Sequence, residues 1–244
     1  MEILKVNSVT SGYDKESILK EVSLNIDKGK IVGLIGSNGA GKTTLIKTIL
    51  GILPIMSGSI DLLGKNVLEF PENLKNEMAY IPETPLLYDE FTLFEHLQFT
   101  AMAHDIEKSV FTERMNELLE QFNMKDKLHH FPNTFSKGMK QKVMIMCAFL
   151  YNPSLLIVDE PFIGLDPTAI SLLIKQIQQK REKGMGILLC THVLDTAEKI
   201  CDEFVLINDG KVIISGGLKV LQEQSGLIEQ SLTDIFCNVM GAKT

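Results

Sequence analysis

Short apolar runs alternate with longer stretches of mixed polarity along most of the chain. The runs are bounded by Gly, Asp or Lys, which is typical of buried strands. The predicted strands are EILKVNSV, VSLNI, IVGLI, SGSIDLLG, MAYI, LLIVD, GILLCT, EFVLIN and KVIIS. The dipeptide Asp209-Gly210 between the last two predicts a hairpin. With helices expected at 41–50 and 136–151, the alternation indicates an α/β fold with a largely parallel sheet.

Residues 84–135 depart from this alternation. They contain helical stretches and no clear strand, so we expect a helical insertion there. Its first helix is predicted at 92–104, where Thr92 and Glu95 form a T-x-x-E capping box. Helix is expected to continue with breaks to about Phe122.

Composition and charge exclude several classes of protein. The 244 residues carry a formal net charge of -7 with no block of Lys or Arg, which disfavours nucleic-acid binding by charge alone. The four cysteines are widely spaced, so neither a zinc site nor a disulfide framework is expected. The first residues, MEILKVNSV, alternate like a strand and do not resemble a signal peptide. No apolar run is long enough to span a bilayer, so we expect any action at a membrane to require a partner.

The segment GSNGAGKTT matches the phosphate-binding pattern G-x-x-x-x-G-K-[ST] and lies between a predicted strand and a helix. Its glycines allow backbone N–H groups to turn toward a phosphate, Lys42 can reach the β- and γ-phosphates, and the Thr43 hydroxyl can bind Mg²⁺. The predicted nucleotide-binding residues are Gly36, Ser37, Asn38, Gly39, Ala40, Gly41, Lys42, Thr43 and Thr44.

Two acidic residues end the apolar run LLIVDEP. Asp159 closes the predicted strand, where a carboxylate can hold Mg²⁺ through water. Glu160 follows it and is positioned to orient or deprotonate an attacking water. A third carboxylate, Glu83, lies in the turn YIPETP, where Pro82 and Pro85 exclude regular helix.

These motifs occur in the same order as in the ATP-binding subunit of ABC transporters, and the resemblance to that family covers nearly the whole chain. FSKGMKQ stands in the place of the signature loop, Gly164 to Asp166 resembles the D-loop, and His192 resembles the switch histidine. Tyr13 resembles the aromatic that stacks on adenine, and Glu83 occupies the place of the Q-loop glutamine. IPETPLLYDEFTLFEHL and the terminal SLTDIF are similar to the ATP-binding subunit of Ecs-type exporters, which belong to the ABC-2-like group.

The resemblance implies a P-loop nucleotide-binding domain of mixed α/β class. It combines a RecA-like sheet core, an antiparallel β subdomain and a helical insertion. The core and β subdomain are expected at 1–83 and 152–217, the helical subdomain with the signature helix at 84–151, and a helical tail at 218–244.

The resemblance also implies how the chain works. Two copies would face head to tail, each binding ATP and Mg²⁺ between the phosphate loop of one and the signature residues of the other. Those residues are Ser136, Lys137, Gly138 and Met139. Glu160 would activate water, His192 would hold the γ-phosphate, and Asp166 would couple the two sites. A separate integral membrane permease would hold the dimer at the cytoplasmic face of the membrane, and the resemblance implies a role in peptide export or secretion.

Two positions depart from the family pattern. The signature reads F-S-K-G-M where L-S-G-G-Q is usual, and Glu83 replaces a neutral amide. We hypothesise that Glu83 ligates Mg²⁺ or its water, and that Lys137 of the second copy offsets the added negative charge. In the alternative interpretation, Lys137 faces solvent and Glu83 is a tolerated variant.

Two other functions compete with the exporter. A soluble ATPase clamp acting on nucleic acid or ribosomes usually has two ATPase domains in one chain, or a long coiled coil, and neither is expected here. A binder that does not hydrolyse ATP is disfavoured by the intact set Lys42, Asp159, Glu160 and His192.

Overall fold

The computed structural model describes the chain except residues 15, 70–73, 75, 163–164 and 242–244. Its strands are β1 (Glu2–Tyr13), β2 (Glu16–Asp27), β3 (Ile31–Ile35), β4 (Ile55–Leu62), β5 (Lys65–Asn66), β6 (Met78–Ile81), β7 (Leu155–Asp159), β8 (Gly186–Cys190), β9 (Glu203–Asn208) and β10 (Lys211–Gly216). Its α-helices are α1 (Lys42–Ile49), α3 (Leu93–Ala103), α4 (Lys108–Gln121), α5 (Lys137–Leu150), α6 (Pro167–Glu182), α7 (Leu194–Ile200), α8 (Leu218–Ser225) and α9 (Leu232–Gly241).

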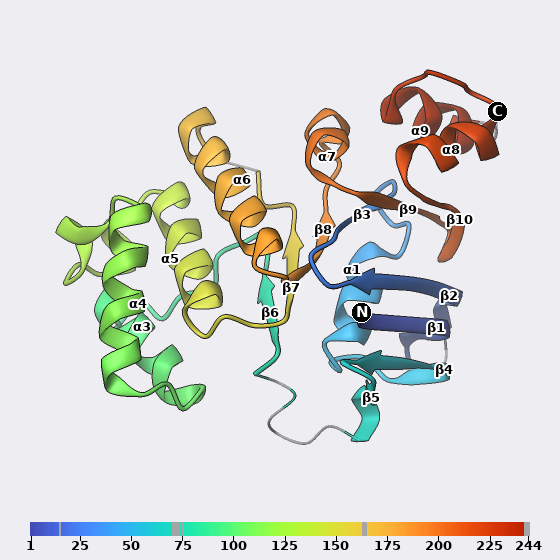
Figure 1. Ribbon diagram of the computed structural model, residues 1–244. Helices are drawn as coiled ribbons and strands as arrows, with labels where there is room; N and C mark the ends of the chain where they lie inside the picture. The colour runs from blue at the N-terminus through green and yellow to red at the C-terminus, as the bar shows by residue number, and fades with distance from the viewer. Residues whose placement is uncertain (15, 70–73, 75, 163–164, 242–244) are drawn as a thin grey trace.

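The strands form two sheets (Figure 1). The six-stranded sheet has the order β10-β9-β3-β8-β7-β6 and is parallel from β9 to β6. Only its edge strand β10 pairs antiparallel, through the predicted turn at Asp209 and Gly210, whose φ angles of 48° and 76° are those of a tight hairpin. The other sheet, β2-β1-β4-β5, is antiparallel. The predicted α/β class, with a mixed sheet and a separate antiparallel sheet, is therefore confirmed.

Both faces of the six-stranded sheet are buried at the strands β3, β7 and β8, which explains why these three strands are continuously apolar. In β7, Leu155 and Ile157 pack toward the antiparallel sheet and α1, whereas Leu156 and Val158 pack toward the other face. Successive side chains of a strand point to opposite faces, so this five-residue run joins two hydrophobic cores.

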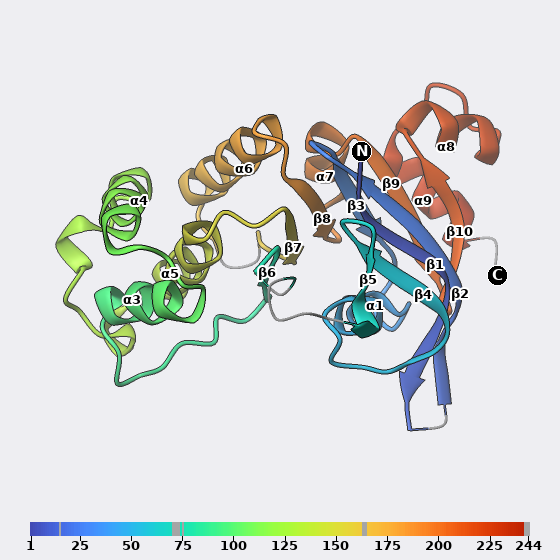
Figure 2. The same cartoon turned by 60° about the horizontal axis from the view of Figure 1, so that its bottom comes forward.

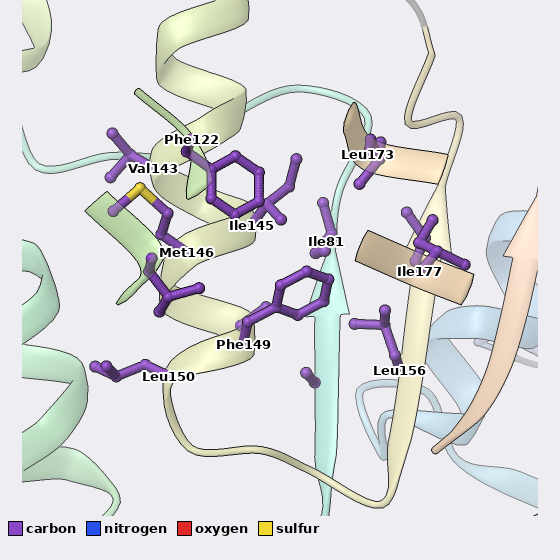
Figure 3. Packing of buried hydrophobic residues seen from close by; sticks show 14 of the residues in the cluster. Ile81, Phe122, Val143, Ile145, Met146, Phe149, Leu150, Leu156, Leu173 and Ile177 are labelled. Atoms are coloured by element: carbon purple, nitrogen blue, oxygen red, sulfur yellow. The ribbon is translucent and has the colours of Figure 1, made fainter. Parts of the chain in front are cut away.

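Helices α5 and α6 lie against the second face, beside β6 and β7, and α3 and α4 pack on the far side of α5 (Figures 1 and 2). Figure 3 shows side chains of α5, Phe149 among them, lying between that helix and Ile81 of β6, with Leu156 of β7 and Ile177 of α6 close by. The insertion thus shares one continuous apolar core with the sheet, and its separation as a subdomain at 84–151 stays a prediction.

The C-terminal helices form a third apolar cluster. Helices α7, α8 and α9 pack around Ile35, Phe204 and Leu206 of the sheet, with Leu232 and Ile235 of α9 buried. No helix within the described residues has the length and apolar character that a membrane span requires.

Candidate functional site

The phosphate loop connects β3 to α1. Gly39 and Gly41 have φ angles of +81° and +107°, and a Cβ atom at Gly36 would lie 2.5 Å from the carbonyl oxygen of Ile207. These three positions therefore require glycine. The Lys42 Nζ donates hydrogen bonds to the carbonyl oxygens of Gly36 (2.7 Å) and Ser37 (3.0 Å), so the ammonium group spans the loop. Helix α1 has no acidic residue in its first turn, so its N-terminus offers an uncompensated positive end to an anion.

Asp159 lies beside the loop, at the carboxyl end of β7. The residue is 8 % exposed, and the Tyr80 hydroxyl of the neighbouring strand donates to its Oδ2 over 3.5 Å. Burial raises the pKa of the Asp159 carboxyl, and the nearby carboxylates of Glu160 and Glu83 raise it further. Burial, followed by the charge of Asp159, raises the pKa of Tyr80 to about 12, so the phenol keeps its proton and remains a donor.

Glu160 and His192 contact each other directly. The Glu160 Oε1 lies 2.9 Å from His192 Nδ1, and its Oε2 accepts a 3.2 Å hydrogen bond from the backbone N–H of His192. An ionised carboxylate only accepts, so Nδ1 carries the proton and Nε2 remains for another partner. Glu160 has a φ of 46°, in the left-handed region, and its backbone N–H donates to the carbonyl oxygen of Cys190. This geometry accompanies the contact of its side chain with His192, two residues beyond the end of β8.

A cavity of about 340 Å³ joins these groups. Its lining includes Lys42, Thr43, Glu83, Asp159 and Glu160. Three carboxylates and a hydroxyl are oxygen ligands of the kind that Mg²⁺ prefers. The same carboxylates would repel a polyphosphate unless a cation lay between them, so the charges fit a nucleotide bound together with a divalent metal ion.

Tyr13 contributes an aromatic side chain to the lining of this cavity. It ends β1, is 44 % exposed, and lines the cavity together with Ile18 of β2. The Lys47 Nζ lies 3.3 Å from the Tyr13 hydroxyl and 5.6 Å from the centre of its ring. An exposed aromatic face beside a phosphate loop can stack on a base. The sequence prediction did not include Ile18, because an isolated apolar residue in a strand carries no signal of ligand contact.

A second cavity, of about 490 Å³, adjoins the first and shares Asn38, Glu83 and Glu160 with it. His192 lines it, as do Leu194 of α7 and Phe236 of α9. Neither Leu194 nor Phe236 was predicted. Both residues are far from the phosphate loop in the sequence, and nothing in their local sequence indicates that they line the second cavity. Only the packing of the C-terminal helices on β3 and β9 brings them there.

The signature residues lie apart from both cavities. Ser136 caps α5 by accepting a hydrogen bond from the Met139 N–H (3.3 Å), and Lys137 occupies the first turn. None of Ser136, Lys137, Gly138 and Met139 lines either cavity in the described part of the chain. One contact still connects α5 to the site, because the buried Gln141 donates to the carbonyl oxygen of Pro82 (3.3 Å), the residue before Glu83.

Asp166 is also outside the cavities. It is the N-cap of α6, where its Oδ1 accepts a hydrogen bond from the Ala169 N–H (3.0 Å). Gly164, the first residue of the predicted D-loop, lies outside the described residues.

Comparisons with known proteins agree with this geometry. The family described as "ABC transporter" matches residues 19–163. The chain is 48 % identical to the ABC-type transporter ATP-binding protein EcsA of Bacillus subtilis (strain 168), over 97 % of this chain and 96 % of that protein. It is 45 % identical to the ABC transporter ATP-binding protein YthP of the same strain, over 96 % and 95 %. A solved structure, described as the ATP binding subunit of an ABC transporter, is 44 % identical, with a TM-score of 0.94 and coverage of 98 % and 99 %.

Proposed function

The chain belongs to the ABC transporter ATP-binding family, and from this premise we propose that it hydrolyses ATP to drive a bacterial exporter. The observation that carries the proposal is the cavity in which the phosphate loop faces three carboxylates. Lys42 binds the β- and γ-phosphates, and Tyr13 stacks on the adenine. Thr43, Asp159 and Glu83 would hold Mg²⁺, which would supply positive charge to offset the charge that develops on the phosphates.

In the proposed reaction, water attacks the γ-phosphorus and the bond to the β–γ bridging oxygen breaks. Glu160 accepts the proton of the attacking water, and ADP leaves with the electron pair of the broken bond. The Nδ1 of His192 holds the Glu160 carboxylate, whereas its Nε2 faces the γ-phosphate. The pairing of Glu160 with His192 keeps the base oriented before substrate arrives.

A second copy of the chain completes each site in this proposal. The signature residues of α5 lie outside the cavities of their own chain, so they are available to the nucleotide of the partner copy. The N-terminus of α5, capped by Ser136, would direct its positive end at the γ-phosphate held by the other copy. ATP then holds the two copies together, and hydrolysis with product release separates them.

Transport requires an integral membrane permease, which would keep the dimer at the cytoplasmic face of the membrane. The similarity to EcsA, an ABC-type transporter ATP-binding protein, supports this assignment. The resemblance of the sequence to Ecs-type exporters implies a role in peptide export or secretion. The hydrogen bond from Gln141 to Pro82 connects the signature helix to the turn carrying Glu83. That turn leads into the helical insertion, so it is a hinge through which closure reaches the permease.

Purification of the chain from native membranes in mild detergent, followed by an ATPase assay, tests the proposal. We expect a polytopic membrane protein at equal stoichiometry and Mg²⁺-dependent release of phosphate. A cytosolic chain that purifies with ribosomes or nucleic acid would overturn the exporter in favour of a soluble clamp. A complex with no ATPase activity would overturn the enzymatic part.

A further inference from the structure

Two neighbouring cavities far from the ATP site concentrate basic groups, although the chain is acidic. The first, of about 220 Å³, contains Lys28, Lys180 and Lys183 and no carboxylate. The second, of about 260 Å³, contains Arg114, Lys180, Lys183 and one carboxylate, Glu117. They share Asn152, Lys180 and Lys183, and we call them together the lysine pocket.

The lysine pocket lies at the amino end of β7, and the ATP cavity lies at its carboxyl end. Ser154, which directly precedes β7, lines it, whereas Asp159 at the other end of β7 lines the ATP cavity. Five residues of strand separate the two sites by ~16 Å. The walls of the second cavity come from α4 and α6 and from the end of α5, which lie side by side in Figures 1 and 2. The first cavity is also lined by Ile3 of β1, by Lys28 and by Leu63.

Lys180 is the central cation of the pocket. Its Nζ donates to the Asn152 Oδ1 (3.2 Å) and lies 5.2 Å from the centre of the Phe149 ring. The pKa of Lys180 is lowered to about 8, first by burial and then by the charges of Lys183 and Arg114, which together outweigh the opposing charge of Glu117. The cations therefore repel one another, and an anion among them would relieve that repulsion.

Gln176 contributes a polar side chain to the second cavity. It is 5 % exposed and lines the second cavity, yet its side-chain amide makes no hydrogen bond within the part of the chain that the structure describes. Gln141 Oε1, and not the Gln176 amide, is the buried side-chain polar atom without a partner in the described residues, so the Gln176 amide is open to the cavity and its N–H groups are free to donate to a bound molecule. The neighbouring amides of Gln121, Gln179 and Asn152 add further N–H donors to the lining.

We propose that the lysine pocket is a second anion-binding site, which takes a phosphate group between Lys180, Arg114 and the amide of Gln176. Tetrahedral oxyanions carry several acceptors and match a lining of ammonium, guanidinium and amide donors. The Glu117 carboxylate opposes the binding of an anion, and a neighbouring cavity that shares Glu117 and Lys183 is also lined by Glu120 and Glu182. We therefore place the bound phosphate away from these carboxylates, on the side of the pocket near Asn152. Free phosphate and a phosphate monoester share this chemistry.

Calorimetric titration of the full chain with inorganic phosphate tests the site, with the ATP cavity filled by a non-hydrolysable ATP analogue and Mg²⁺. We expect saturable binding that Lys180→Met and Gln176→Leu each weaken by about tenfold or more. Lys175→Met, which removes an exposed lysine from the same helix, is the matched control and should leave the affinity unchanged. Titration with glycerol 3-phosphate distinguishes the sources, because a site for esters binds it more tightly than phosphate.

The proposal is overturned if no saturable binding occurs up to ~10 mM phosphate, or if Lys175→Met weakens binding as much as Lys180→Met. Gln176→Glu keeps the shape of the side chain and adds a negative charge, so it should abolish binding even if Gln176→Leu unfolds the protein. Sulfate has no titrating proton near pH 8, so any proton taken up when it binds must go to the protein. Binding of sulfate at pH 8 should therefore protonate Lys180 and take up protons in the wild type, but not in Lys180→Met. Absence of proton uptake in the wild type would remove Lys180 from the site.

Discussion

The carboxylate of Glu160 makes two contacts with one residue, His192, through its ring and its backbone. Replacement by an amide keeps the shape of the side chain but removes the base, so Glu160→Gln should lower the rate of ATP hydrolysis by at least about 10²-fold. ATP binding should remain, and ATP-bound dimers should accumulate. Phosphate release and size-exclusion chromatography with ATP measure the two effects.

Glu182→Gln, an exposed change at the end of α6, is the matched control and should hydrolyse ATP at the wild-type rate. Normal turnover in Glu160→Gln would exclude Glu160 as the group that activates water.

The lowered pKa of Lys180 leads to a second prediction about a single residue. Its pKa of about 8 in the folded protein lies below the ordinary value of 10.5, so the charged form is penalised by folding. The penalty is complete below pH ~8 and is lost as pH rises through the window between the folded and ordinary values. In the ligand-free protein at pH 7, Lys180→Met should therefore raise the free energy of unfolding. After a discount for solvent screening, the gain is on the order of 1 kcal/mol.

Urea unfolding of wild type and Lys180→Met at pH 7 and pH 10 measures this difference. The gain should shrink at the higher pH. A gain that is independent of pH would mean that the methionine packs better and that the lysine charge is not penalised.

At the scale of the element, helix α3 depends on its N-terminal cap. The Thr92 Oγ1 accepts a hydrogen bond from the Glu95 N–H, and the Glu95 carboxylate accepts one from the Thr92 N–H (2.7 Å), which confirms the predicted capping box. Thr92→Ala should lower the free energy of unfolding by about 1 kcal/mol, because two helix-end donors lose their defined geometry. Chemical denaturation measures the loss.

Thr112→Ala is the control for this change, since the Thr112 hydroxyl only bonds back to the Lys108 carbonyl within α4. It should change the free energy of unfolding by no more than a few tenths of a kcal/mol. A similar loss in both variants would show that the cap adds nothing beyond an ordinary threonine.

At the scale of the whole molecule, substitutions at Glu83 and Lys137 can test whether two copies of the chain form a shared ATP site. Glu83 lines both cavities, whereas Lys137 is exposed at the start of α5. If Lys137 of one copy faces Glu83 of the other, charges ~6 Å apart at an effective dielectric of ~20 interact by ~3 kcal/mol before screening. The effects of Glu83→Gln and Lys137→Gly on the ATPase rate should then be non-additive.

A double-mutant cycle on the ATPase rate, at low and high salt, measures this coupling. Additive effects would favour the alternative, in which Lys137 faces solvent and Glu83 is a tolerated variant.

The sequence by itself determined the elements with a strong local period or a demanding backbone. The apolar strands, the hairpin at Asp209 and Gly210, and the start of α3 follow from near-neighbour physics. The glycines of the phosphate loop belong to the same class, since Gly39 and Gly41 have φ angles of +81° and +107°, which other residues adopt only with strain. The long strands β1 and β2 were only partly predicted, because their bulged pairing interrupts the alternation.

Only the tertiary structure decided which distant residues meet. The contact between Glu160 and His192 depends on the pairing of β7 with β8, and the presence of Phe236 at the rim depends on packing of α9. The lysine pocket likewise gathers Lys28, Arg114 and Lys180 from three parts of the chain. Contacts between side chains of different elements depend on the order of the strands and the packing of the helices. Strand order and helix packing follow from the burial of apolar surface over the whole molecule, so a short stretch of sequence does not specify them.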